Sequence, residues 1–339
     1  MAVAYVLEPP TIPNTVFLPV TLVLSGRTLV RKGRLIPEWK EFASAADARA
    51  RLDEVIRTHE RAGYLLVETS EVGEEIAPEE IGSVLTIAVD AATKRMTVIS
   101  HSRDESPTAE MLDTIAARLR KHEPRCLHVA PDLRWRRPQL AKALIPSLES
   151  FIFDYDTVAR QSDNTLGDIS DVLEACPSLK RAFITGCSTM RTTRHEHLRE
   201  LFLMGNPLHS SVMSALVASQ LPGLETLALR QEEFSAADLA GSLRSIEAPR
   251  LSHVYVEGAP VLELLAAVGT AELPWSLGII DPMFDDVDGL WEVLEKHDAL
   301  RSGKVRLHSE TFFDDELERL VEMGVMVEDM SDVFAYSDW

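Results

Sequence analysis

A short phrase of the form Leu-x-x-φ-x-φ, where φ is an apolar residue, recurs through the second half of the sequence. Clear copies occupy residues 148–153, 179–184, 198–203, 224–229 and 251–256, so their starts are 31, 19, 26 and 27 residues apart. A repeat of this length cannot bury its apolar face alone and must stack on its neighbours. The phrase therefore predicts an array of repeats, each contributing one strand.

Weaker copies and the stretches between copies complete the pattern. Residues 125–129, 275–280 and 304–307 carry partial phrases. Between the copies, residues 212–217, 239–246, 261–268 and 290–294 place apolar side chains three or four apart, which is helical spacing. We therefore expect an α/β fold in which parallel strands alternate with helices.

This half of the chain resembles leucine-rich-repeat proteins, whose period is 20–29 residues. Members of that family often place Asn or Cys eight residues after the first Leu, where Cys187 and Asn206 stand here. Asp156, Glu232 and Ala259 depart from that pattern. The resemblance implies a leucine-rich-repeat solenoid over residues 82–339, with a cap over its last repeat.

Composition limits the classes of function. Hydrophobic residues make up 45% of the chain, which is enough for a sizeable core. Lys and Arg total 34 against 54 Asp and Glu, a formal net charge of −20 that repels nucleic acid over most of the surface. Three cysteines are too few for a disulfide framework or a zinc site.

The location of the protein is also predicted from what the sequence lacks. There is no basic leader followed by an apolar stretch, and no run of about 18 apolar residues. We expect a cytoplasmic protein with no membrane partner.

The first 70 residues predict a separate α+β module. Apolar β-rich runs flank Ser25-Gly26, which predicts a hairpin, and Ser44 is placed to cap a helix that Gly63 ends. Residues 64–67 return to strand. Residues 71–81 are rich in Glu and are predicted to be an acidic linker between the two modules.

The first module resembles a WGR domain. The resemblance rests on residues 32–34, on 39–44 and on the Ala-rich helix closed by 62–64, and it covers about residues 5–68. WGR domains occur in poly(ADP-ribose) polymerases and in bacterial regulator-like proteins, where the signature Trp and Arg lie near nucleic-acid ends. The resemblance implies possible DNA or RNA binding through Arg31, Lys32 and Arg34. Lys32 replaces the signature Trp, and the alternative is a protein-contact module.

The period of the repeats also predicts which side chains lie outside the core. The φ residues point inward, and alternate residues line the concave sheet. The fifth position of each phrase forms one column across adjacent strands, called here the aromatic column: Ile152, Phe183, Phe202, Ala228 and Tyr255. Its predicted neighbours are Arg181, Met204, Arg230, His253 and Glu257.

An exposed aromatic stripe with charged flanks has the composition of a protein-binding patch. We therefore expect these residues to bind another protein. Two alternatives remain open: the register is shifted by one residue, or residues 82–120 or the C-terminal tail cover the column.

A basic cluster lies in the second module, before its first clear repeat. Arg134, Arg136 and Arg137 surround one Trp, an arrangement that could hold phosphates and stack a base. A basic surface that meets an acidic partner is an equally good interpretation.

Motifs for catalysis and for cofactors or metals are weak. The sequence has no phosphate loop, dinucleotide fingerprint, nucleophile elbow or His-Glu-x-x-His helix. His195 and His197 lack a third ligand, and a calcium-loop pattern over 284–295 begins with Phe284, which has no oxygen to offer. We expect no cofactor and no metal.

The last residues, 328–339, are acidic and carry Phe334, Tyr336 and Trp339. They are interpreted as a capping strand, with a docking tail as the alternative. Taken together, the sequence predicts a non-catalytic interaction or scaffold protein. The alternative is a nucleic-acid-associated regulator that binds through the WGR-like module, and a hydrolase or transferase is a more distant third.

Overall fold

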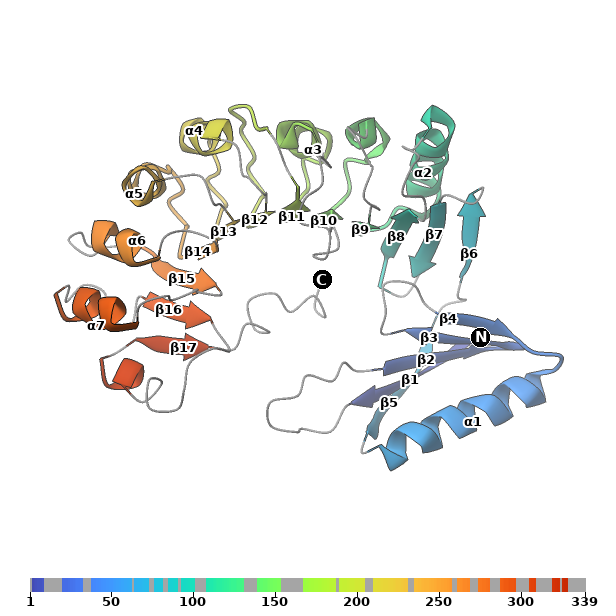
Figure 1. Ribbon diagram of the computed structural model, residues 1–339. Helices are drawn as coiled ribbons and strands as arrows, with labels where there is room; N and C mark the ends of the chain where they lie inside the picture. Colours follow the sequence, from blue (N-terminus) through green and yellow to red (C-terminus); the bar gives the residue numbers. More distant parts are fainter. Residues whose placement is uncertain are drawn as a thin grey trace.

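The structure is a computed structural model. It describes residues 2–8, 20–32, 38–62, 64–72, 76–81, 85–90, 93–100, 108–130, 139–153, 167–186, 189–204, 210–230, 235–257, 261–268, 274–280, 287–296, 305–308, 319–323 and 325–328. These residues form a mixed α/β protein with two sheets, one of five strands and one of twelve (Figure 1).

The five-stranded sheet is antiparallel and has the order β4-β3-β2-β1-β5. Its strands are β1 (Ala2–Glu8), β2 (Val20–Ser25), β3 (Thr28–Lys32), β4 (Glu38–Glu41) and β5 (Leu65–Val72). The predicted hairpin is confirmed, because β2 and β3 pair across a turn in which Gly26 has φ +57°. That positive φ favours glycine. Strands β1 and β4 were not predicted.

Helix α1 (Ala45–Arg61) packs on this sheet and begins where the sequence predicts. The Ser44 hydroxyl oxygen accepts a hydrogen bond from the Asp47 amide at 3.1 Å, which satisfies one of the open donors of the first turn. Leu52 from α1 joins Leu7, Leu22 and Leu29 in a small core.

The predicted acidic linker is wrong. Residues 71 and 72 end β5, and residues 76–81 form β6 (Ile76–Ile81), the first strand of the large sheet. The pairing of β6 with β7 shifts register between Ile76 and Glu79, around Pro78. Proline has no amide hydrogen to donate and is tolerated at such an edge-strand irregularity. The glutamates that indicated a linker thus belong in part to a strand at the edge of the large sheet.

The large sheet begins antiparallel and then becomes parallel. Strands β6, β7 (Leu85–Asp90) and β8 (Arg95–Ser100) are antiparallel, and every neighbouring pair from β8 onward is parallel. The remaining strands follow in chain order: β9 (Cys126–Ala130), β10 (Ser150–Phe153), β11 (Arg181–Thr185), β12 (Glu200–Met204), β13 (Thr226–Arg230), β14 (His253–Glu257), β15 (Ser276–Ile280), β16 (Val305–His308) and β17 (Met326–Glu328). All eight strands predicted from full or partial phrases are present.

Helices line one side of this curved sheet (Figure 1). They are α2 (Ala109–His122), the 3-10 helix η1 (Gln139–Ala143), α3 (Ile169–Ala175), α4 (Ser210–Ala218), α5 (Ala236–Arg244), α6 (Val261–Val268) and α7 (Val287–Lys296). The four predicted helical stretches correspond to α4–α7. One continuous core joins helix residues such as Val212 and Leu239 to strand residues such as Leu203 and Leu229. Among the described helices, none is both long and apolar enough to cross a lipid bilayer.

A turn with proline at its second position starts four of the repeats. The amides of Leu148, Leu179, Leu224 and Leu251 each donate to the carbonyl three residues earlier, at 3.0–3.2 Å. Each of these leucines follows a Pro-x pair, and proline at that position favours a β-turn because its φ is already set. The turn aims the first Leu of the phrase into the core, where all four are buried.

Candidate binding face of the large sheet

The aromatic column has the register that the sequence predicts. Ile152 pairs with Phe183, Phe183 with Phe202, Phe202 with Ala228, and Ala228 with Tyr255 along strands β10–β14. These side chains and Cys126 form a cluster separate from the main core. The column therefore stands on the face of the large sheet that turns away from the helices, called here the inner face (Figure 1).

The expected exposure of this column is wrong. Ile152 and Ala228 are 0% exposed, Phe183 is 3% and Phe202 is 4% exposed, whereas Tyr255 is half-buried. The aromatic rings of Phe183 and Phe202 lie 5.8 Å apart. Alternation along a strand decides which face a side chain takes, but not what packs over that face, so the sequence predicts the first and not the second.

A second column on the inner face keeps part of its surface accessible. Its members lie two residues before those of the aromatic column on the same strands. This second set is called here the polar column: Arg181, Glu200, Thr226, His253 and Ser276. All five side chains are half-buried. Arg181 Nε lies 3.1 Å from Glu200 Oε1, and the side chains are 41% and 26% exposed. Partial burial raises the pKa of Glu200, and the guanidinium of Arg181 opposes that shift.

An ion pair stands on the other side of the aromatic column. Arg230 Nη2 lies 2.8 Å from Glu257 Oε1, and only 16% and 13% of the two side chains are exposed. Met204 occupies the same register position on β12, one strand from Arg230. The His253 and Tyr255 rings stack at 6.4 Å. The predicted flanking residues Arg181, Arg230, His253 and Glu257 are thus gathered around the aromatic column.

A histidine that sequence reasoning missed extends the inner face toward β8. His128 pairs in register with Thr97 and Ile152 and is 3% exposed. Arg95 Nη2 donates to His128 Nδ1 at 2.8 Å, so the neutral ring carries its proton on Nε2. Nε2 has no hydrogen-bond partner among the described residues. Burial, and then the Arg95 charge, lower the pKa of His128 to about 4.

Cys126 lies two residues before His128 on the same face of β9 and is 8% exposed. Burial raises the pKa of its thiol, and the charges of Arg95 and Arg181 oppose that shift. The position therefore has an inert, protonated cysteine rather than an activated nucleophile.

His195 has a structural role, because both of its ring nitrogens make hydrogen bonds to the backbone. Its Nδ1 accepts a hydrogen bond from the Leu198 amide at 3.0 Å, so the ring replaces the turn carbonyl used in the other repeats. Its Nε2 donates to the Cys176 carbonyl at 3.0 Å. Burial lowers the pKa of His195, and His197 is exposed. Within the described ranges, no three His, Cys, Asp or Glu side chains gather as metal ligands.

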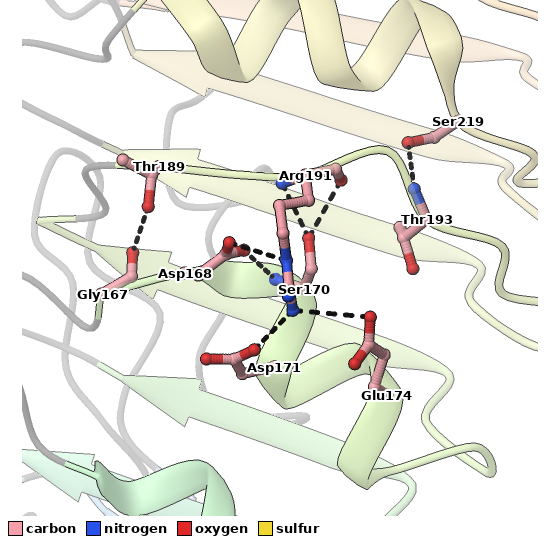
Figure 2. A network of polar contacts seen from close by, with 9 residues as sticks. All are labelled: Gly167, Asp168, Ser170, Asp171, Glu174, Thr189, Arg191, Thr193 and Ser219. Carbon is pink, nitrogen blue, oxygen red and sulfur yellow. Dashed lines mark hydrogen bonds and ion pairs between the residues drawn. The ribbon is translucent and has the colours of Figure 1, made fainter.

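The short spacing between the phrases at 179 and 198 is accommodated by a polar network instead of a helix (Figure 2). The Ser170 hydroxyl donates to the Arg191 carbonyl and accepts from the Arg191 amide, both at 2.9 Å. The Arg191 guanidinium reaches Asp168, Asp171 and Glu174 around the start of α3. Farther along, the Thr193 amide donates to Ser219 Oγ at 3.0 Å. The network fastens an extended segment to its neighbours and has the character of a structural clamp.

Most residues proposed for nucleic-acid binding lie outside the described part of the chain. Arg31 is half-buried on β3, and Lys32 ends that strand. The side chain of Lys32, all of Arg34, and Arg134, Arg136 and Arg137 are outside the described residues. Cys187, Asn206 and residues 284–286 of the calcium-loop pattern are also outside them, whereas residues 287–295 of that pattern belong to α7.

Comparisons with known proteins bear on the fold alone. No protein-family model matches the chain, and no curated protein matches it. A structural-genomics crystal structure of a protein from Bacteroides fragilis is similar, with a TM-score of 0.51 and 16% sequence identity, over 98% of this chain and 97% of that chain. At that identity the likeness extends to the mixed α/β architecture of the whole chain and carries no function with it.

Proposed function

We propose that this chain is a non-catalytic protein-interaction protein, built as a leucine-rich-repeat-type solenoid, that binds another protein through the inner face of its large sheet. The observation that carries the proposal is the polar column. Five side chains on five successive strands stand in one register, and all remain partly accessible. Stacked repeats create extended concave surfaces of this kind for binding partners.

The chemistry of the column fits protein recognition better than catalysis. Arg181 and His253 offer donors, Glu200 offers acceptors, and Tyr255 adds a half-buried aromatic ring beside His253. Arg and Tyr are enriched among residues that dominate binding energy at protein interfaces. Beside His253, which belongs to the column, Cys126 and His128 are buried and uncharged at neutral pH. Neither of these two side chains is therefore an activated nucleophile or base.

The burial of the aromatic column changes which residues are expected to contact a partner. Ile152, Phe183 and Phe202 lie on the same face but are buried, so contact passes to the more accessible Arg181, His253 and Tyr255. Truncating an accessible anchor at the centre of such an interface costs about 2 kcal/mol or more.

The test is capture by the tagged full-length chain from a lysate of its source organism, run with and without nuclease. We expect discrete proteins that survive nuclease and that fall at least tenfold with the Arg181→Ala/His253→Ala double variant. Arg194→Ala is the matched control, because this 71%-exposed side chain precedes β12 and lies outside the sheet. Equal capture by the double variant would overturn the proposed face. Loss of every captured protein on nuclease treatment would favour the nucleic-acid alternative.

A further inference from the structure

Four basic side chains gather where the parallel part of the large sheet begins. Arg120 and Lys121 belong to the last turn of α2, and residues 123–125 connect that turn to β9. Arg125 directly precedes β9, and its amide donates to the carbonyl of Lys94 at 2.8 Å, just before β8. The short connection and this hydrogen bond hold the four residues at one place in the fold, and they are called here the basic patch.

The charge of the basic patch is largely uncompensated. All four side chains are exposed, and within the described ranges the three other than Arg125 form no ion pair. Arg125 Nε lies 4.0 Å from Glu149 Oε1, but that carboxylate has a closer partner in Lys180, at 2.9 Å. Residues 118–125 hold four Arg or Lys side chains against one Glu, in a chain whose formal net charge is −20.

The dipole of α2 explains only half of the patch. Cations in the last turn of a helix are stabilised by the partial negative charge at its C-terminus, and this applies to Arg120 and Lys121. Lys94 and Arg125 precede strands and lie outside any helix, so the stability of α2 does not account for them. Their position beside the helix end concentrates positive charge on one exposed surface.

The composition of the patch selects the class of partner. Protein interfaces are rich in aromatic residues and poor in Lys, and membrane-binding surfaces add apolar side chains that enter the lipid. The exposed large hydrophobic side chains of the described residues lie elsewhere, at positions 65–67 and at Val321. Protein–DNA interfaces are polar and strongly positive, and proteins that bind single strands stack the bases on aromatic rings. None of the four patch residues is aromatic, so a duplex with outward-facing phosphates fits the patch best.

We propose that the basic patch binds the phosphate backbone of double-stranded DNA without reading its sequence. Each of the four side chains contacts a phosphate and releases a condensed counterion. The acidic remainder of the chain repels DNA, so binding is expected at low salt and weakens steeply as salt is added. The inference goes beyond the proposed function and does not depend on it, because the patch lies at the strand starts beside α2 and not on the inner face.

Fluorescence anisotropy of a labelled DNA duplex, titrated with the full-length protein, tests the proposal. We expect saturable binding at about 50 mM salt, and the logarithm of the affinity should fall against the logarithm of the salt concentration with a slope of about −4. The Arg120→Gln/Lys121→Gln/Arg125→Gln variant should bind about tenfold or more weakly, with a slope smaller in magnitude by about 3. Glutamine keeps a good helix propensity at the two positions in α2. A duplex of unrelated sequence should bind equally well.

The matched control is the Arg194→Gln/Arg250→Gln/Lys296→Gln variant, which makes the same change in net charge at exposed positions in other repeats. It should bind the duplex as the wild type does. Equal weakening by the two triple variants, or no binding at low salt, would overturn the proposal. Equal competition by polyglutamate would overturn it too, because the patch would then be a surface for acidic proteins.

The unfolding midpoint of each variant shows whether its fold is kept. If the patch variant has a lower midpoint than the wild type, Lys121→Gln/Arg125→Gln replaces it, with Arg194→Gln/Lys296→Gln as the control. The double patch variant should reduce the magnitude of the salt slope by about 2, and an unchanged slope would contradict the proposal.

Discussion

Arg95 donates a hydrogen bond to Nδ1 of His128 between the parallel strands β8 and β9, at 2.8 Å, and burial together with this charge keeps the ring neutral. The pair forms where the antiparallel start of the large sheet meets its parallel part. It couples the charge of an arginine to a histidine whose other nitrogen is buried without a partner among the described residues.

This pair predicts an acid-dependent loss of stability. The folded pKa of His128 is about 4, below the ordinary 6.5, so the unfolded chain takes up the proton first as pH falls. Stability is therefore fully present above about pH 6.5 and declines toward pH 4, by roughly 3 kcal/mol at most. Urea unfolding at several pH values should show a shallower decline for His128→Gln than for the wild type. The exposed His197→Gln variant should keep the wild-type slope, and equal slopes for all three proteins would contradict the prediction.

Ser170 should matter more to stability than the arginine it contacts. Ser170 is 0% exposed and its hydroxyl makes two hydrogen bonds to the Arg191 backbone, so Ser170→Ala leaves a buried donor and acceptor unpaired. We expect a loss of about 1–3 kcal/mol in the free energy of unfolding. Arg191→Ala removes ion pairs from a 56%-exposed side chain and should cost less than about 1 kcal/mol. Chemical denaturation of both variants would show the order, and the reverse order would exclude a clamp based on the serine.

Two glycines should respond oppositely to alanine. A Cβ on Gly223 would lie 2.7 Å from the Glu196 carbonyl oxygen, because the proline turn before β13 presses against the preceding repeat. Gly223→Ala must shift backbone and should lower the thermal midpoint. Gly241 lies within α5 with open space around its Cβ position, so Gly241→Ala should stabilise by about 1 kcal/mol. Equal thermal midpoints for the two variants would show that the turn at Gly223 is not packed closely against the Glu196 backbone.

The edge of the small sheet predicts self-association. Strand β5 is an edge strand, and Leu65, Leu66 and Val67 are 69%, 41% and 49% exposed. Exposed apolar edge strands template pairing with other chains, and charge on such an edge suppresses it. The Leu65→Lys/Val67→Lys variant should therefore aggregate more slowly on heating, as followed by light scattering, without a lower unfolding midpoint. An unchanged aggregation rate would show that self-association does not use the β5 edge.

Local sequence determined the order of the strands and helices of the large sheet and which face of each strand packs against the core. The Leu-x-x-φ-x-φ phrase sets strand positions, and the period of two sets which residues enter the core, so the register from Ile152 to Tyr255 was predictable. Helices α4–α7 followed from apolar spacing alone. These features depend on residues within a few positions of one another.

Tertiary structure decided what lies over each face and which side chains meet across strands. Phe183 and Phe202 are 3% and 4% exposed on a face that the sequence predicted to be open, and the pairing of Arg95 with His128 joins residues 33 positions apart. The glutamates before β7 form a strand because an edge of the large sheet was available to pair with them. Alternation within a strand is a local property, whereas exposure is set by the whole chain, and so the column was predictable from the sequence while its burial was not.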